Sequence, residues 1–174
     1  WGQGFDRVKA AKIISKAIDC GVNFIDTADV YGDGLSENIV GEEYGRTKAF
    51  YIATKCGRKL KPHVAAGYNR ENITRFVDDS LKNMKLECLD LIQLHCPPTD
   101  LYYQPEVFAV LDDLKKQGKI AHDGVSVERI EEALKAIEYP GLATVQIIFN
   151  MFRLRPAGLF FEQAKQKNIG VIVR

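Results

Sequence analysis

The sequence predicts an α/β protein whose parallel sheet curls into an incomplete (β/α)₈ barrel of about six βα units. Strand-like segments recur near residues 24, 52, 91, 122, 145 and 171, separated by amphipathic helical segments, which is typical of parallel sheets. No Gly-x-Gly-x-x-Gly follows the first strand, so a doubly wound dinucleotide-binding sheet would lack its phosphate loop. Several strands end on reactive side chains, which favours a barrel, because a barrel gathers its strand ends at one face.

The first helix is expected over about residues 6–20, with Asp6 as its N-cap and Gly21 just beyond its end. Its apolar face would consist of Val8, Ala11, Ile14 and Ile18. A strand at about 22–26 follows. The glycines at 32 and 34 then indicate a turn, and Ser36 is expected to cap a short helix.

The next strand is expected at about 50–55, and a basic connector at 57–67 follows it. We interpret the cations of this connector as parts of a solvated loop and not of a phosphate site. Asn69 then begins a strongly periodic helix with one apolar stripe, formed by Ile73, Phe76, Val77, Leu81 and Met84. A strand at 89–94 is stopped by two prolines.

The last third of the chain continues the alternation. Pro105 suits the first turn of a helix that Gly118 ends. The remaining segments are a strand at about 120–125, a helix through Ile130, Leu134 and Ile137, a strand at about 143–148, a helix at about 157–167 and a strand at 169–173.

The composition fits one globular domain over residues 1–174, with 46% hydrophobic and 27% charged residues. A formal charge of +1, without long runs of one sign, argues against a dedicated nucleic-acid or membrane-surface protein. No apolar stretch approaches the roughly 20 residues that span a bilayer. No two of the four cysteines form a Cys-x-x-Cys pair, which indicates free thiols in a cytoplasmic protein and no metal site.

A closed (β/α)₈ barrel typically needs about 250 residues, and this chain has 174. The chain opens at what resembles a loop after a missing strand. We therefore expect a single, partial barrel domain with two open sheet edges, which is either a piece of a longer protein or only the ordered part of one.

Four reactive residues follow or end three consecutive strands. Asp26 and Tyr31 stand five residues apart after the first strand, and Lys55 and His95 end the next two. Each alone has an ordinary structural interpretation: a cap, a packing phenol, a surface lysine, a buried histidine. Brought together at one face, an acid, a phenol, an ammonium and an imidazole can deliver a proton.

These motifs resemble the aldo-keto reductases, in their order and spacing. The resemblance is carried by the segments 24–32 (FIDTADVYG), 52–55 (IATK) and 89–95 (LDLIQLH), and the later strands fit the same pattern. It implies a TIM barrel that reduces aldehydes or ketones with NADPH, and a catalytic tetrad of Asp26, Tyr31, Lys55 and His95. Tyr31 would be the general acid, and the Lys55 ammonium, paired with Asp26, would lower its pKa.

The resemblance also implies residues that contact the cofactor. Ser126 and Gln146 would bind the nicotinamide amide, Arg174 would pack on the ring, and Trp1 would line the pocket. Ser126 has an alternative interpretation as a helix cap. The family usually has an asparagine where this chain has Val127, so one amide ligand is absent. The resemblance places the strand and loop that hold the cofactor phosphates after the seventh strand, so we expect them beyond residue 174.

Two other functions remain open at this point. The first is a non-catalytic regulatory subunit that binds NADPH on the same fold, like the potassium-channel β-subunits that resemble this family. The second is a segment that is inactive by itself. The substrate, the preference for NADPH over NADH and the oligomeric state are not encoded in any motif of these 174 residues.

Overall fold

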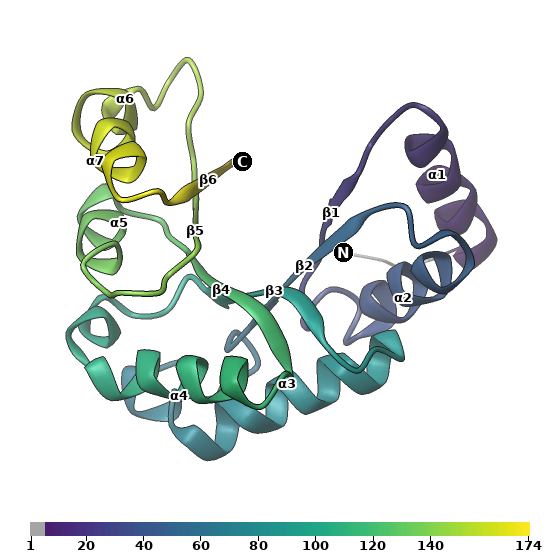
Figure 1. Cartoon of the computed structure of the whole chain (residues 1–174), viewed down its shortest axis with the longest axis horizontal. Helices are drawn as coiled ribbons and strands as arrows, with labels where there is room; N and C mark the ends of the chain where they lie inside the picture. Colours follow the sequence, from purple (N-terminus) through teal and green to yellow (C-terminus); the bar gives the residue numbers. More distant parts are fainter. Residues whose placement is uncertain (1–5) are drawn as a thin grey trace.

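The computed structural model describes residues 6–174 and shows one six-stranded parallel sheet. Its strands are β1 (Phe24–Asp26), β2 (Tyr51–Cys56), β3 (Leu89–His95), β4 (Ile120–Ser126), β5 (Thr144–Ile147) and β6 (Gly170–Val173). Each strand pairs with the next one in the chain. The sheet curls, so that the arm with β1 and the arm with β6 stand on opposite sides of an opening (Figure 1). The predicted incomplete barrel of about six βα units is confirmed.

The helices cover the outer, convex side of the sheet (Figure 1). They are α1 (Arg7–Asp19), α2 (Leu35–Thr47), α3 (Arg70–Met84), α4 (Pro105–Lys116), α5 (Ile130–Ala136), α6 (Arg155–Leu159) and α7 (Phe161–Gln166), with short 3₁₀ turns η1 (Ala65–Gly67) and η2 (Thr99–Tyr103). Among residues 6–174, no helix is both long and apolar enough to cross a membrane.

Alternation along the strands separates two sets of side chains. Ile92, Leu94 and Val125 belong to the buried core between sheet and helices. The intervening residues face the inside of the curl, because successive strand side chains point to opposite faces. One inner row is set by the register, in which Lys55 pairs with Gln93, Gln93 with Gly124, Gly124 with Thr144 and Thr144 with Gly170. The inner rows carry Lys55, Gln93, His95, Ser126 and Gln146, whereas Thr54 and Asp123 point outward and bind side chains of the helices.

Two local expectations were wrong. Ser36 does not cap α2, because Gly34, at φ 88°, turns the chain and the helix already begins at Leu35. The Ser36 hydroxyl instead accepts a hydrogen bond from Thr27 Oγ1 at 2.8 Å. The single helix expected at 157–167 is two short helices that meet at the wholly buried Phe160.

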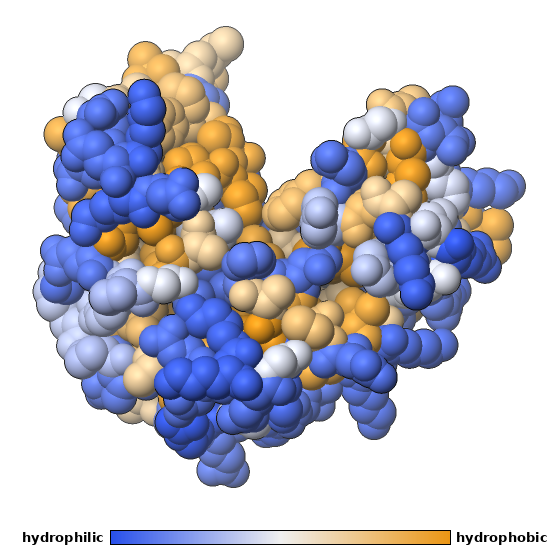
Figure 2. Space-filling view, in the orientation of Figure 1, coloured by the Kyte–Doolittle hydropathy of each residue, from blue (hydrophilic) through white to orange (hydrophobic). Residues whose placement is uncertain are grey.

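The two arms leave apolar side chains uncovered. Phe24 on β1 and Val171 and Val173 on β6 are exposed, and within residues 6–19 no side chain of α1 is fully buried. Orange surface lines the hollow between the arms in Figure 2. Both terminal strands therefore have an unpaired edge within the described part of the chain, as the sequence predicted.

Candidate active site

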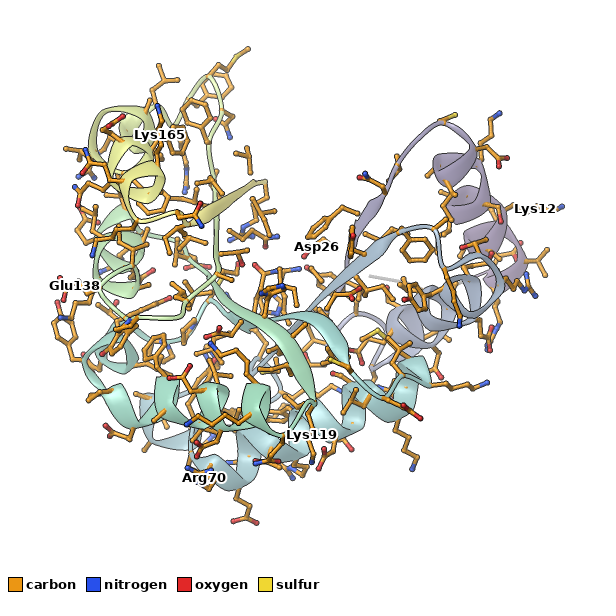
Figure 3. All side chains as sticks on the ribbon, in the orientation of Figure 1. Lys12, Asp26, Arg70, Lys119, Glu138 and Lys165 are labelled. Atoms are coloured by element: carbon orange, nitrogen blue, oxygen red, sulfur yellow. The ribbon has the colours of Figure 1, made fainter. Side chains whose placement is uncertain are left out.

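The carboxyl ends of the parallel strands bring three of the four predicted catalytic residues to one face. Asp26 ends β1, His95 ends β3, and Lys55 is the second-last residue of β2. Figure 3 labels Asp26 on the arm that carries β1, beside the opening. Tyr31 follows β1 in a turn, where its N–H donates to the Ala28 carbonyl at 3.0 Å. The fold therefore gathers all four residues.

Lys55 and Asp26 form an ion pair on neighbouring strands. Lys55 Nζ lies 2.5 Å from Asp26 Oδ2 and donates a second hydrogen bond to the Thr27 carbonyl at 2.8 Å. Lys55 is only 1% exposed. Burial lowers its pKa, and the hydrogen bond and charge of Asp26 oppose this effect. Asp26 thus helps Lys55 to stay positively charged at a buried position where water cannot stabilise the ammonium.

Tyr31 lies next to both Lys55 and His95 and is 44% exposed. Lys55 Nζ is 5.5 Å from the centroid of its ring. The rings of Tyr31 and His95 meet edge to face, with their centroids 6.0 Å apart. The phenol therefore stands at the rim of the opening, where a small molecule can reach it.

The direction of the Tyr31 pKa differs from the expectation. Partial burial and then the negative charge of Asp26 raise the pKa of the phenol, and Arg174 lowers it less. Lys55 was expected to lower this pKa, but its charge is paired with Asp26. The phenol therefore stays protonated at neutral pH, which is the state in which it can donate a proton.

His95 is a neutral imidazole in this environment. It is 8% exposed, and burial, followed by the charges of Lys55, Arg58 and Arg174, lowers its pKa to about 3. Its buried Nδ1 has no hydrogen-bond partner among residues 6–174. A neutral ring can donate or accept a hydrogen bond without bringing a second positive charge beside Lys55.

The next inner row carries two of the predicted cofactor contacts. His95 pairs in register with Ser126, and Ser126 with Gln146. Ser126 and Gln146 are both buried. Ser126 is not a helix cap, because α5 begins only after Arg129, and its hydroxyl lies 3.4 Å from Cys96 Sγ. The structure therefore brings Ser126 and Gln146 together beside the tetrad.

Arg174 also reaches this place from the end of β6. Its Nη2 donates to Cys96 Sγ at 3.5 Å. Arg58 is exposed, as expected of a loop cation, and it also donates from Nε to the His95 carbonyl at 3.3 Å and pairs with Glu128 at 3.1 Å. Its position three residues after Lys55 was the available sequence signal. Trp1 lies outside the described residues.

Two surface hollows lie away from the tetrad. A hollow of about 600 Å³ lies between α1 and α2 and is bordered by Arg7 and Glu42, and another of about 320 Å³ lies beside α5 and α6. None of the tetrad residues lines either of them. In the described part of the chain, no cluster of three or more His, Cys, Asp or Glu side chains could hold a metal ion.

Glu37, in the first turn of the helix that follows Tyr31, is a buried anchor of α2 that the sequence did not reveal. This buried carboxylate accepts hydrogen bonds from Thr54 Oγ1 at 2.6 Å, Ser80 Oγ at 2.8 Å and Asn83 Nδ2 at 2.8 Å. It thereby ties α2 to β2 and α3. A glutamate close to Ile39 and Val40, on the buried side of a helix, was the signal that could have identified it.

Asp29 is a second buried carboxylate, between Asp26 and Tyr31 in the chain. It is 3% exposed, and neither oxygen has a hydrogen-bond partner among residues 6–174. Burial, and then the charge of Glu37, raise its pKa to about 7, while Lys59 opposes them. The folded protein therefore holds a proton on Asp29 that the unfolded chain releases near pH 4.

We expect Asp29→Asn to flatten the pH dependence of stability. Between about pH 4 and 7 the folded state binds more protons than the unfolded state, so stability falls as the pH rises through this window. The loss is on the order of 2–4 kcal/mol by pH 8. Melting temperatures by circular dichroism from pH 5 to 8 measure it, with Asp100→Asn, at an exposed carboxylate elsewhere in the chain, as the control. Parallel pH profiles for Asp29→Asn and the wild type would contradict the assignment.

Comparisons with known proteins decide the family. The family model described as "Aldo/keto reductase family" matches residues 1–174. Aldo-keto reductase YhdN from Bacillus subtilis (strain 168) is 33% identical over 177 residues, which cover 99% of this chain and 53% of that protein. The chain belongs to the aldo/keto reductase family. It spans about half the length of the curated relatives that it matches.

Solved aldo-keto reductases share the fold. The holo form of aldo-keto reductase AKR11C1 from Bacillus halodurans is 27% identical, with a TM-score of 0.87 over 98% of this chain and 58% of that chain. An aldo/keto reductase from Klebsiella pneumoniae, solved in complex with NADP and acetate, is 22% identical, with a TM-score of 0.82 over 98% of this chain and 60% of that one. At 22% identity this second likeness shows the fold alone. The six strands correspond to part of an aldo-keto reductase barrel.

Proposed function

We propose that this aldo-keto reductase chain carries the proton-delivery part of an NADPH-dependent site that reduces aldehydes or ketones to alcohols. The observation that carries the proposal is the meeting of Tyr31, Lys55 and His95 at one strand-end face, with Asp26 paired to Lys55. A small carbonyl compound can reach the half-exposed Tyr31 from the opening.

Each residue has a role that follows from its state. Tyr31, protonated and exposed, donates a proton to the carbonyl oxygen of the substrate. His95, neutral and next to Tyr31, orients that oxygen by a hydrogen bond. Lys55 supplies a positive charge that stabilises the phenolate left on Tyr31. Asp26 keeps Lys55 charged and in place.

The residues present fit the nicotinamide end of the cofactor. Ser126 and Gln146 offer a hydroxyl and a carboxamide at the end of the inner rows, and no hydrogen bond engages the Gln146 amide within residues 6–174. Val127 is buried in the core, and its apolar side chain can neither donate a hydrogen bond to the nicotinamide amide nor accept one from it. When bound, the cofactor supplies the hydride. We assign Ser126 and Gln146 to its amide and Arg174 to the neighbouring surface.

A chimera tests the function. In it, residues 1–174 replace the matching segment of the Bacillus halodurans aldo-keto reductase, which supplies the remaining parts of the barrel. We expect the chimera to consume NADPH in the presence of small aldehydes or ketones, as measured by the loss of absorbance at the nicotinamide band. A folded chimera that binds NADPH but consumes none with any carbonyl would favour the regulatory-subunit alternative.

The 174-residue chain itself gives a second measurement. The phosphate-binding parts of the family are expected beyond residue 174, so we expect weak or undetectable binding when NADPH is titrated into the chain and its fluorescence is followed. Tight binding would show that residues 1–174 hold the cofactor without those parts.

A further inference from the structure

Gln93 is a wholly buried carboxamide in the middle of β3, and the roles proposed above leave it unused. Buried amides in folded proteins nearly always serve a hydrogen-bond partner. Gln93 Nε2 donates to Asp26 Oδ1 at 3.2 Å, while Asp26 Oδ2 faces Lys55 Nζ. The two oxygens of this carboxylate are thus divided between a neutral amide and a charged ammonium.

The amide orientation is determined by the carboxylate. Gln93 Oε1 is buried without a partner among residues 6–174, so the amide satisfies only one of its ends. If the amide were reversed, Oε1 would face Asp26 Oδ1, and two acceptors repel each other. The hydrogen bond that Nε2 donates to Asp26 therefore stabilises this orientation by more than the unpaired Oε1 destabilises it.

The inner row leaves room for this side chain. Its register neighbour on β4 is Gly124, which has no side chain to compete for the space. A Cβ on Gly124 would stand 2.1 Å from Thr144 Oγ1, so the side chain of Thr144 on β5 already occupies the space above this glycine. Gln93 thus lies between Lys55 on one neighbouring strand and an open glycine on the other.

We propose that Gln93 is a positioning residue of the active site, which holds the Asp26 carboxylate against Lys55. Asp26 needs this second contact because its side chain is 32% exposed and can otherwise turn toward water. The position of Lys55 Nζ, 5.5 Å from the Tyr31 ring, then depends on a chain of contacts from Gln93 through Asp26. The link to proton transfer rests on the proposed function, but the hold on Lys55 does not.

The pKa of Lys55 in the 174-residue chain measures the hold directly. Burial lowers this pKa and Asp26 opposes the effect. If the Asp26 carboxylate is held less firmly against Lys55, the pKa of Lys55 should therefore decrease further. In Gln93→Met, which keeps the size of the side chain but has no donor, we expect a decrease of about 0.5–1 unit. Isotope-labelled lysine side-chain resonances, followed by NMR against pH, give the value, and Lys55→Met assigns the resonance.

Two further variants separate positioning from a general effect on packing. Leu91→Met changes a buried side chain two residues earlier on the same face of β3, and we expect no change in the pKa of Lys55. In an Asp26→Asn background, Gln93→Met should add no further shift, because the effect passes through the carboxylate. If Gln93→Met does not fold, Gln93→Leu takes its place in the same series.

An unchanged Lys55 pKa in a folded Gln93 variant would overturn the proposal, and so would an equal shift in the Asp26→Asn background. Turnover is read separately in the chimera, where Gln93→Met should lower kcat several-fold with KM nearly constant. If the chimera has no activity but the Lys55 shift is found, the proposed function fails and the positioning role stands.

Discussion

Replacing Tyr31 by phenylalanine in the chimera is expected to lower kcat by about 10²–10⁴-fold, the usual contribution of a general acid. The substitution removes one hydroxyl and keeps the ring, so its edge-to-face contact with His95 and its contact with Lys55 are retained. The substrate oxygen then loses its proton donor. His95 cannot replace it, because its pKa is lowered to about 3 and the imidazole is therefore already neutral at pH 7. Steady-state turnover with a small aldehyde measures the loss.

The binding of NADPH should be nearly unchanged by the same substitution, because the phenol is assigned to the carbonyl oxygen and not to the cofactor. Tyr51→Phe is the matched control, since Tyr51 is an exposed phenol at the opposite end of β2. We expect this control to keep the wild-type rate. If Tyr31→Phe kept most of the activity, the general-acid assignment would be wrong.

Gly41→Ala is expected to destabilise the fold by about 3 kcal/mol, although it adds a single methyl group. Gly41 is buried on α2, where the helix touches the end of α3. A Cβ at this position would stand 2.3 Å from the Met84 carbonyl oxygen and 2.5 Å from Met84 Cα. These are backbone atoms, so the contact is relieved only if the two helices move apart.

Gly45→Ala, one helical turn later, is the matched control. Gly45 is exposed, and a Cβ there meets no atom within 4 Å. This substitution should stabilise the protein by about 0.5–1 kcal/mol, because alanine favours the helix over glycine. Chemical denaturation followed by circular dichroism measures both. Equal stabilities of the two variants would show that α2 and α3 are not packed backbone to backbone.

The strand order and the gathering of the strand-end side chains at one face were predictable because both depend on local patterns. Short apolar runs bounded by turn residues marked all six strands, and parallel strands necessarily bring their carboxyl ends together. Asp26, Lys55 and His95 each stand at such an end. Their mutual contacts are therefore a consequence of the sheet, and so is the row that continues to Ser126 and Gln146.

Properties that depend on the neighbours in space were not predictable. The pKa of Tyr31 rises and does not fall, because the balance between Asp26 and Lys55 is decided by their distances and by burial. No sequence pattern singled out Asp29, because its burial comes from packing that no local pattern encodes. Gln93 is recognisable in the sequence as a polar residue in an apolar strand, but its hydrogen-bond partner, Asp26, is 67 residues away in the chain.

The strands lie in the sheet in the same order as in the chain, and this order has a consequence for how the protein is synthesised and folded. Each strand pairs with the one synthesised just before it, from β1 to β6. Each strand pairing therefore closes only the one βα crossover between successive strands, and none has to close a loop that spans several units. A ribosome can thus extend this protein by one βα unit at a time onto an existing template, and the site residues are assembled in the order in which they emerge.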